Sequence, residues 1–315
     1  MSRPSRFAVP TESPARWLPM AILAAACASV LAYPRAPAAT PQRWAPANIA
    51  SDQYESSPTF SPDGRELYFM RSDRNFAQWR ILRSRCTDAG WSPPESPSFA
   101  AGRAGLDADP FLADDGRRLY FVSARHDPNG EDLDIYYVQR EPGGDWGAPV
   151  RLPAPVNSPA SELLPRALAD GRLLFGSSRE GGLGQGDLYM ATPGADGAWR
   201  VRNLGAPVSS AANEYEADLS HDGRELVAVT DRGDRSHLYR YRLERGRWRE
   251  LGKLPARQDV FQVGPLLSPR GDRLLFAQAD GERSGEFFVL DLRPGADRHW
   301  PPECVAKSAA NAAIK

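Results

Sequence analysis

The amino-acid sequence predicts an all-β protein built from tandem copies of one small β-sheet, and three observations carry this prediction. The chain holds 27 glycines and 29 prolines among its 315 residues, which indicates many tight turns between short strands. One turn signature that ends in glycine recurs five times along the chain. Two apolar runs of strand length follow every copy of that turn.

The turn signature recurs at nearly constant spacing. Its glycines lie 48 to 55 residues apart and are Gly64, Gly116, Gly171, Gly223 and Gly271. In the first copy, Pro62 presets φ, Asp63 bonds to its own backbone and Gly64 adopts positive φ, so the segment forms a tight turn between two strands. An internal period of about 50 residues is typical of a repeat architecture.

The apolar runs show how each copy is buried. In the first copy they cover residues 67–69 and 79–82, and in the second 119–121 and 134–138. They are apolar at consecutive positions, which indicates strands that are buried on both faces. Each copy ends on a tryptophan, namely Trp91, Trp146, Trp199, Trp248 and Trp300. A four-stranded sheet covered on both faces by its own copies is a blade of a β-propeller.

Five copies over residues 42–305 predict five four-stranded blades in a closed ring, or six if one blade lacks the signature. A sixth tryptophan, Trp44, begins a segment over residues 44–49 that is similar to the last strand of a blade. That segment would close the ring by completing the C-terminal blade, a position for which Trp300 competes. The sequence leaves both choices open.

The N-terminal residues 1–32 read as an export signal. Arg3, Arg6 and Arg16 precede an apolar stretch over residues 17–32, which is shorter than the roughly 20 residues of a spanning helix. This pattern is typical of a secretory signal. Lipid attachment at Cys27 and a retained anchor are the alternatives. Residues 33–41 then form a Pro/Ala-rich linker and residues 306–315 a C-terminal tail, so we expect a periplasmic or secreted protein that touches a membrane only through a lipid anchor.

Export would leave Cys86 and Cys304 as the only cysteines of the mature chain. An oxidising compartment permits a disulfide between them. Two unpaired, buried thiols are the competing interpretation.

Several segments share a common pattern. It begins with an acidic residue, two further residues and proline, and continues with a turn and a run that contains aromatic residues. It ends with Asp followed by a second run of this kind. It is clearest at 107–110, 134–136, 157–165 and 187–189. The pattern resembles the TolB-type, WD40-like propeller repeat of bacterial envelope proteins, and the resemblance covers nearly the whole mature chain. Trp79 departs from it in the first copy, and copies four and five lack the second Asp. We expect a propeller-only relative, without the N-terminal domain that precedes the propeller in TolB.

An acid three residues before the proline position recurs in four copies as Glu55, Asp107, Glu162 and Glu214, with Gln262 in the fifth. We expect it to open the innermost strand and to form a negative ring at one mouth of the central channel, where a cation or a basic partner segment could bind. Alternatively, each acid caps neighbouring backbone or pairs with an arginine. Arginines that would tie neighbouring blades recur after the second strand as Arg74, Arg125, Arg179 and Arg232.

One loop offers oxygen ligands for calcium, namely Asp127, Asn129, Glu131 and Asp132. The loop lacks the EF-hand spacing, and Asn129-Gly130 is a usual hairpin turn. The sequence therefore predicts no cofactor, with calcium as the alternative. The glycine-rich loop over residues 180–186 is expected to be a hairpin loop and not a phosphate cradle, because no helix is expected after it.

The residue pattern favours binding over catalysis. The four histidines occupy unrelated positions, and no Gly-x-Ser-x-Gly segment occurs. A formal net charge of −1 leaves no basic field for nucleic acid. We therefore expect a monomeric, non-enzymatic scaffold that binds an envelope protein or peptide through the channel-mouth acids and loops at Asn129 and Gly182. The alternative is a carbohydrate-active or hydrolytic propeller that uses the channel-mouth carboxylates.

Overall fold

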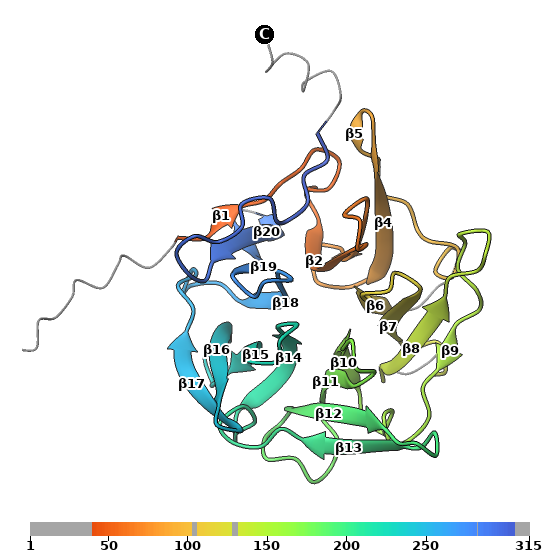
Figure 1. The fold of residues 1–315 in the computed structure, drawn as a ribbon. Coiled ribbons are helices and arrows are strands. Elements are labelled where there is room, and N and C mark those ends of the chain that lie inside the picture. Colours follow the sequence, from red (N-terminus) through yellow and green to blue (C-terminus); the bar gives the residue numbers. More distant parts are fainter. Residues whose placement is uncertain (1–39, 103–105, 128–131, 282, 306–315) are drawn as a thin grey trace, which may run out of the picture. The chain divides into compact units, whose positions relative to one another are not determined.

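The computed structural model describes residues 40–102, 106–127, 132–281 and 283–305. Within these ranges the secondary structure consists of strands and turns without a helix, and no helix long and apolar enough to cross a membrane is found there. The sheets stand around a common axis, as Figure 1 shows. The predicted signal segment, Cys27 and the predicted C-terminal tail lie outside the described residues.

The strands fall into groups of four antiparallel neighbours, each running from the axis outward. The first group is β2 (Tyr54–Phe60), β3 (Glu66–Ser72), β4 (Arg80–Thr87) and β5 (Gly90–Trp91). The second group is β6 (Asp107–Leu112), β7 (Arg118–Ser123), β8 (Asp134–Gln139) and β9 (Val150–Arg151). The third group is β10 (Glu162–Ala167), β11 (Leu173–Ser177), β12 (Asp187–Pro193) and β13 (Trp199–Asn203).

The last two groups complete the ring. The fourth group is β14 (Asn213–Leu219), β15 (Glu225–Asp231), β16 (Ser236–Glu244) and β17 (Arg247–Lys253). The fifth is β18 (Gln262–Leu267), β19 (Arg273–Asp280), β20 (Arg283–Asp291) and β1 (Gln42–Arg43). A single parallel pair, Tyr54 with Gly285, joins β2 to β20, so the first and fifth groups are connected. All-β sheets of this kind confirm the predicted propeller-like fold.

The recurring glycines stand in the turns between the first and second strands, as predicted. Each glycine donates its amide to the carbonyl of the residue three positions earlier, at 2.7 Å between Gly64 N and Ser61 O and 2.7 Å between Gly271 N and Ser268 O. All five adopt positive φ between 60° and 84°. A residue with a Cβ would strain this conformation, so the glycine fixes where each hairpin turns.

A β-bulge interrupts every innermost strand after its second or third residue. In four of the five strands the residue before the proline takes positive φ, and these residues are Ser57, Asp109, Leu164 and Gly264. At Gly264 a Cβ would lie only 2.5 Å from the backbone nitrogen of Ser57 in the first group. The bulge bends the strand and changes which side chains point to the axis.

The N-terminal strand closes the ring. Gln42 pairs with Val289 of β20 and Arg43 with Phe288, and the amide of Trp44 donates to the carbonyl of Phe287 at 2.8 Å. The N-terminal segment therefore takes the outer position of the last sheet, and Trp300 lies outside the strands. Because β1 pairs along the edge of β20, the last sheet gains the fourth strand that its own residues do not supply.

A disulfide lies at the same seam. Cys86 of β4 is bonded to Cys304, with their Cα atoms 5.4 Å apart. Next to it, Pro302 packs against Gly64, so closely that a Cβ on Gly64 would lie 3.0 Å from the proline ring. The segment after β20 is thus attached to the first sheet.

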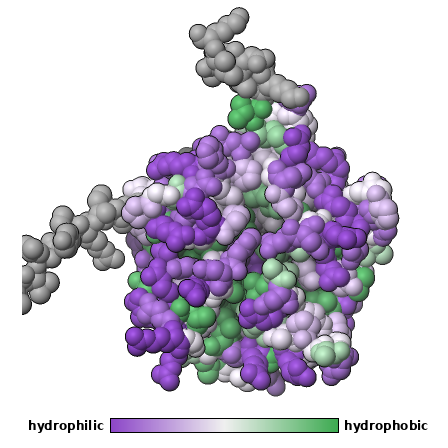
Figure 2. Space-filling view, viewed as in Figure 1, coloured by the Kyte–Doolittle hydropathy of each residue, from purple (hydrophilic) through white to green (hydrophobic). Residues whose placement is uncertain are grey.

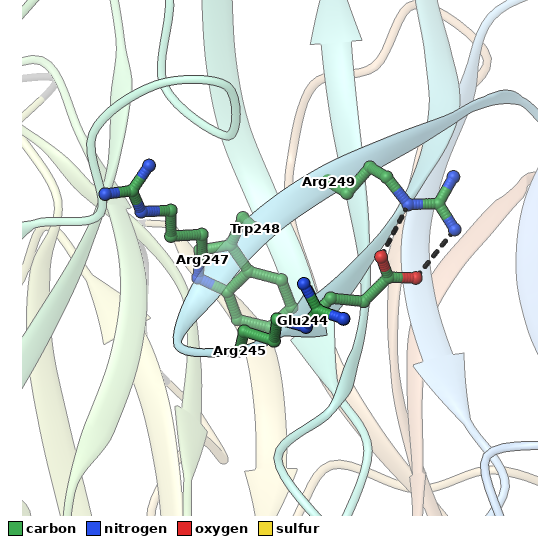
Figure 3. Close-up of a pocket in the computed structure, with 5 residues that line it drawn as sticks. All are labelled: Glu244, Arg245, Arg247, Trp248 and Arg249. Carbon is green, nitrogen blue, oxygen red and sulfur yellow. Dashed lines mark hydrogen bonds and ion pairs between the residues drawn. The ribbon is translucent and has the colours of Figure 1, made fainter.

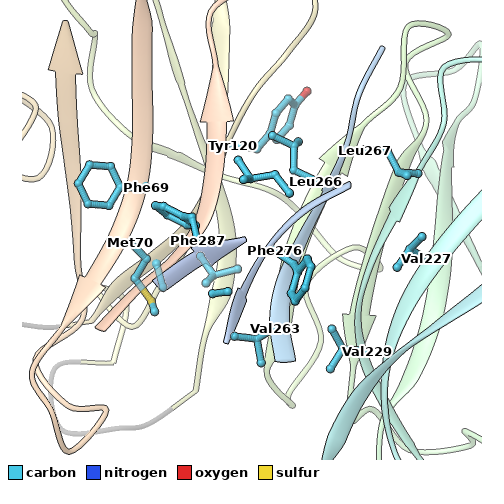
Figure 4. Packing of buried hydrophobic residues seen from close by; sticks show 14 of the residues in the cluster. Phe69, Met70, Tyr120, Val227, Val229, Val263, Leu266, Leu267, Phe276 and Phe287 are labelled. Atoms are coloured by element: carbon cyan, nitrogen blue, oxygen red, sulfur yellow. The ribbon is translucent and has the colours of Figure 1, made fainter. Parts of the chain in front are cut away.

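Apolar side chains fill the space between neighbouring sheets. Phe276 and Phe287 of the last sheet pack in one buried cluster with Val229 of the fourth and Phe69 of the first, as Figure 4 shows. The second strands are buried over nearly their whole length, as the consecutive apolar runs predict. Each such side chain contributes about 1.5–3 kcal/mol when it leaves water, so the ring is stabilised mainly by contact between its sheets.

Candidate functional site

The recurring acids open the innermost strands but do not face the channel. Each is the first or second residue of its strand. The side chains of Glu55, Glu162 and Glu214 are fully buried, and Asp107 is 6% exposed. This burial contradicts the expected role in partner contact, because a buried carboxylate cannot reach a ligand at the channel mouth.

Glu162 shows what the acids do instead. Its carboxylate accepts hydrogen bonds from the hydroxyl of Ser158 at 2.6 Å, the hydroxyl of Ser177 at 3.0 Å and the guanidinium of Arg179 at 3.0 Å. Burial outweighs these interactions and raises the pKa of Glu162 to about 7. Glu214 bonds in the same way to the hydroxyl and amide of Ser210, at 2.6 and 2.9 Å. The acids therefore cap the segment that leads into each strand.

The arginines bond within their own sheet, which corrects the expectation that they tie neighbouring blades. Arg125 pairs with Asp107 at 2.9 Å and Arg179 with Glu162 at 3.0 Å. The reason is the hairpin, since the end of the second strand lies beside the start of the first, as the Glu162–Ser177 pair shows. Arg232 instead pairs with Glu250 at 2.9 Å.

The first sheet departs from this arrangement, which the sequence did not predict. Arg71, three residues before Arg74, binds Glu55 at 2.8 Å. Arg74 makes an exposed pair with Asp52 at 3.2 Å. The first sheet keeps the ion pair but draws the arginine from within β3 instead of from the loop after it.

The candidate calcium loop is only partly described. Asn129 and Glu131 lie outside the described residues, and Asp127 and Asp132 flank the gap. Nearby, Asp134 accepts from His126 at 2.8 Å and pairs with Arg151 at 2.5 Å. Among the residues that the structure describes, no group of three or more His, Cys, Asp or Glu side chains could hold a metal ion.

The glycine-rich loop folds onto its own sheet. The carboxylate of Asp187 accepts the amide of Leu183 at 2.6 Å, and a Cβ on Gly182 would lie 2.1 Å from that carboxylate. The loop amides thus already bind a protein carboxylate, which fits the predicted hairpin loop.

Sequence reasoning missed a polar cluster at the axis itself. Asp109, Arg166, Glu216 and Asp218 come from the middle of β6, β10 and β14, and all are buried. Asp218 lies 3.4 Å from the Arg166 guanidinium and accepts the amide of Leu267 at 2.6 Å. We call these four residues the axial cluster.

The axial cluster joins one sheet to another. Asp109 accepts the hydroxyl of Ser57 at 2.7 Å and the amide of Leu164 at 3.1 Å, and so links the second sheet to the first and the third. Glu216 accepts the amide of Gly264 at 2.6 Å. Arg166 donates to the carbonyl of Pro265 at 3.0 Å, across the axis in the fifth sheet. These contacts, not the predicted arginines, tie the innermost strands together.

Burial dominates the electrostatics of the axial cluster. It raises the pKa of Glu216, to which the nearby Asp109 charge adds, and it raises the pKa of Asp109 and Asp218 although Arg166 opposes the shift. It also lowers the pKa of Arg166. Perturbed groups of this kind concentrate at functional sites, although structural networks share the property.

Two members of the axial cluster, Arg166 and Asp218, form the floor of a cavity of about 650 Å³, whereas Asp109 and Glu216 do not line it. The cavity opens at the end of the ring where the turn glycines lie, and Gly64 and Gly223 are among its lining residues. Its apolar wall residues come from all five sheets and include Phe60, Phe111, Leu168, Leu219 and Leu266. Trp300 and Pro302 of the C-terminal segment add to the wall. We call this cavity the funnel.

Charged side chains surround the mouth of the funnel. His221 of the fourth sheet lies 3.6 Å from Asp114 of the second, so the pair bridges two sheets that are not neighbours. Asp170 and Arg172 form a further pair at 2.7 Å. The recurring acids begin the same strands that end at the funnel, so they lie at the opposite end of these strands from the funnel.

A sequence signal for the axial cluster does exist. Two positions of the innermost strand vary in residue type and charge from copy to copy, while the position between them is proline in four of the five copies. The first reads Ser57, Asp109, Leu164, Glu216 and Gly264, and the second reads Thr59, Phe111, Arg166, Asp218 and Leu266. Positions at which a repeat loses its symmetry are where a unique site can arise.

Comparisons with known proteins agree on the fold. No protein-family model matches the chain, and no curated protein matches it either. Among solved structures, a putative TolB from Agrobacterium tumefaciens is 17% identical, with a TM-score of 0.52 over 78% of this chain and 79% of that one. The fold is TolB-like.

Two further structures mark the limits of that likeness. TolB from Acinetobacter baumannii is 18% identical with a TM-score of 0.50, over 78% of this chain but only 56% of its own. Zg3597, a family 117 glycoside hydrolase produced by Zobellia galactanivorans, is 12% identical with a TM-score of 0.53, over 83% of this chain and 93% of its own. At such identities the likeness extends to the fold alone.

Proposed function

We propose that this chain is an exported, non-enzymatic, five-bladed propeller that binds a protein or peptide in the bacterial envelope, and that the partner enters the funnel. The observation that carries the proposal is the funnel itself, a cavity of about 650 Å³ to which every sheet contributes. Apolar walls with a few polar groups at the floor are typical of ligand sites. The TolB-like fold supports the envelope location.

The shape of the mouth favours a chain segment over a small molecule. The mouth is bordered by exposed turn residues such as Ala169 and Asp170, and the His221–Asp114 pair crosses it. A peptide that enters would separate this half-exposed pair, which costs little because exposed ion pairs contribute about 0–1 kcal/mol. Its side chains could then cover Phe60, Phe111 and Leu168.

Blocking the mouth tests the proposal. Ala169 is exposed and lines the funnel, so Ala169→Trp should fill the mouth without touching the core. Ala198 is an exposed alanine in the β12–β13 turn outside the funnel, and Ala198→Trp is the matched control. After chemical cross-linking in envelope fractions, a partner captured by the unaltered chain and by Ala198→Trp should be lost with Ala169→Trp. Equal capture by both variants would exclude the funnel.

One observation favours the hydrolytic alternative. Asp218 lines the funnel 3.4 Å from Arg166, and burial raises the pKa of its carboxyl group, an environment in which a carboxyl group can serve as a general acid. In this alternative, a panel of envelope glycans should include one that the chain cleaves and that Asp218→Asn leaves intact. If no glycan in the panel is cleaved, the hydrolytic alternative is excluded and the binding role stands.

A further inference from the structure

The hairpin between β16 and β17 carries a cationic surface outside the funnel, on the outer edge of the fourth sheet. β17 is the outermost strand of the fourth sheet and pairs only with β16. Its seven residues make it the longest outer strand of the described ring, against two in β1, β5 and β9 and five in β13. None of the residues of the turn between β16 and β17 lines the funnel.

A hollow on this hairpin is lined by Glu244, Arg245, Arg247, Trp248 and Arg249. Figure 3 shows Arg245 beside the indole of Trp248, with Arg247 and Arg249 extending to opposite sides of it. We call these five residues the basic hairpin. Trp248 is half-buried and packs against the core of its sheet, so the indole is a fixed surface and not a mobile side chain.

Two of the three arginines keep an unbalanced charge. Arg249 binds Glu244 through two hydrogen bonds of 2.7 and 3.0 Å, and the next acid, Glu250, holds Arg232. Within the described part of the chain, no carboxylate lies within ion-pair distance of Arg245 or Arg247, and both are exposed. The basic hairpin therefore carries a net charge of about +2 on a protein whose net charge is −1.

The backbone of the turn is a second, independent indication that the basic hairpin has a function. Arg245 and Gly246 occupy the turn with φ of 52° and 77°, a pair of positive φ values for which Asn-Gly or Gly-Gly is strongly preferred. An arginine in this position is strained, and strain that persists points to function. The turn itself does not need the guanidinium that it carries.

Protection of a free sheet edge explains only part of this arrangement. Cationic side chains on an edge strand prevent pairing with other chains, and β13 carries Arg200 and Arg202 in the same way. Edge protection accounts for Arg247 and Arg249 on β17. It does not account for Arg245 in the turn, which lies beyond the strand.

Phosphate is the group that fits these side chains. Guanidinium groups bind phosphate through paired hydrogen bonds, and an indole fixed beside them suits the boundary between lipid headgroups and water. The described chain begins at residue 40, next to β1 on the outer edge of the fifth sheet, as Figure 1 shows. The fifth sheet neighbours the fourth, which carries the basic hairpin. The apolar stretch over residues 17–32 ends eight residues before residue 40, which is at most about 29 Å of chain.

We propose that the basic hairpin binds the phosphate groups of anionic membrane lipids. This role does not depend on the funnel, so either proposal can fail alone. Arg245 and Arg247 would bind headgroup phosphates, and Trp248 would lie against the headgroup layer. The contact would orient the outer edge of the fourth and fifth sheets toward a bilayer.

Vesicle binding by the full chain tests this proposal. The unaltered chain should bind vesicles of phosphatidylcholine containing about one third phosphatidylglycerol more tightly than pure phosphatidylcholine vesicles, and salt should weaken this preference. One basic side chain near an anionic surface is worth about a five-fold change in binding, so Arg245→Gln/Arg247→Gln should bind about 30-fold more weakly. The matched control is Arg200→Gln/Arg202→Gln, for which we expect less than about a three-fold loss.

A single substitution separates binding from folding. Arg245→Asn suits the turn better and should raise the melting temperature or leave it unchanged, while it weakens binding to anionic vesicles about five-fold. Equal losses in the two double variants, no preference for anionic vesicles, or full binding by Arg245→Asn would each overturn the proposal. Binding to an immobilised anionic polysaccharide that exceeds vesicle binding would overturn it as well.

Discussion

The recurring acids and the axial cluster lie on the same innermost strands but differ in how they are used. Glu55, Asp107, Glu162 and Glu214 repeat from sheet to sheet and bond within their own sheet, mostly to a serine four residues earlier or to an arginine. The axial cluster occurs once and bonds between sheets. Residues that recur from sheet to sheet in this ring are those that each sheet needs in order to fold. Residues that occur in only one or a few sheets can form a site that is specific for one ligand.

The largest expected effect tests the structural half of this comparison. Glu162→Ala removes the acceptor for Ser158, Ser177 and Arg179 and leaves the partly buried Arg179 guanidinium without its carboxylate. Loss of one member of a buried pair costs about 3–5 kcal/mol, so we expect the free energy of unfolding at neutral pH to fall by about 4 kcal/mol. Urea denaturation measures it.

A matched variant controls for loss of charge alone. Arg74→Ala breaks the exposed pair with Asp52 and should cost less than about 1 kcal/mol. If Glu162→Ala costs no more than Arg74→Ala, the recurring acids are not structural and the comparison fails.

The next effect tests the axial cluster. Arg166→Met leaves Asp218 and Asp109 without their cation, so we expect a loss of about 3 kcal/mol at pH 7. The loss should shrink at pH 5, because burial raises the pKa of both carboxyl groups and they take up protons more readily once Arg166 is gone. Unfolding at both pH values measures the difference, with Arg172→Met at the exposed Asp170 pair as the control. A loss that is the same at both pH values would contradict this account.

The smallest effect is a pH dependence set by Glu162. Its pKa is raised from 4.5 to about 7 in the folded chain, so the folded state binds the proton more tightly than the unfolded state between these values. This contribution to stability is complete below pH 4.5 and is lost as the pH rises to about 7. Glu162→Gln keeps a neutral side chain, so the unaltered chain should lose about 2 kcal/mol relative to this variant between pH 5 and 8. Parallel pH profiles of the two chains would show that Glu162 titrates normally.

Much of the fold could be predicted from residues that act locally. Glycine at the turn and consecutive apolar residues after it depend only on neighbouring backbone, so Gly64 and its counterparts predicted the hairpins and the buried second strands. Ring closure could not be assigned, because Trp44 and Trp300 offer the same local pattern and only pairing with β20 distinguishes them. The Cys86–Cys304 disulfide was left open for the same reason, since it depends on two segments that meet only in the closed ring.

The candidate site was harder to predict because it depends on the bulge. Simple alternation along β6 would assign the side chain of Asp109 to the same face as Asp107, which pairs with Arg125. The positive φ at Asp109 interrupts that alternation and brings its side chain to Ser57 of the first sheet. Arg166 and Asp218 follow the bulges of their own strands and meet only because two sheets stand side by side. No spacing rule within one copy could place them together.

The pairing of β1 with β20 also governs the order in which the chain can fold. The two strands are separated by about 250 residues, so β1 must wait, unpaired, until almost the entire polypeptide is available. If the chain crosses a membrane from its N-terminus, every intermediate along the way is an open arc with two bare edges. Such long-range pairing is slow to form, and the final closing step would be the moment at which a nascent molecule escapes aggregation and proteolysis.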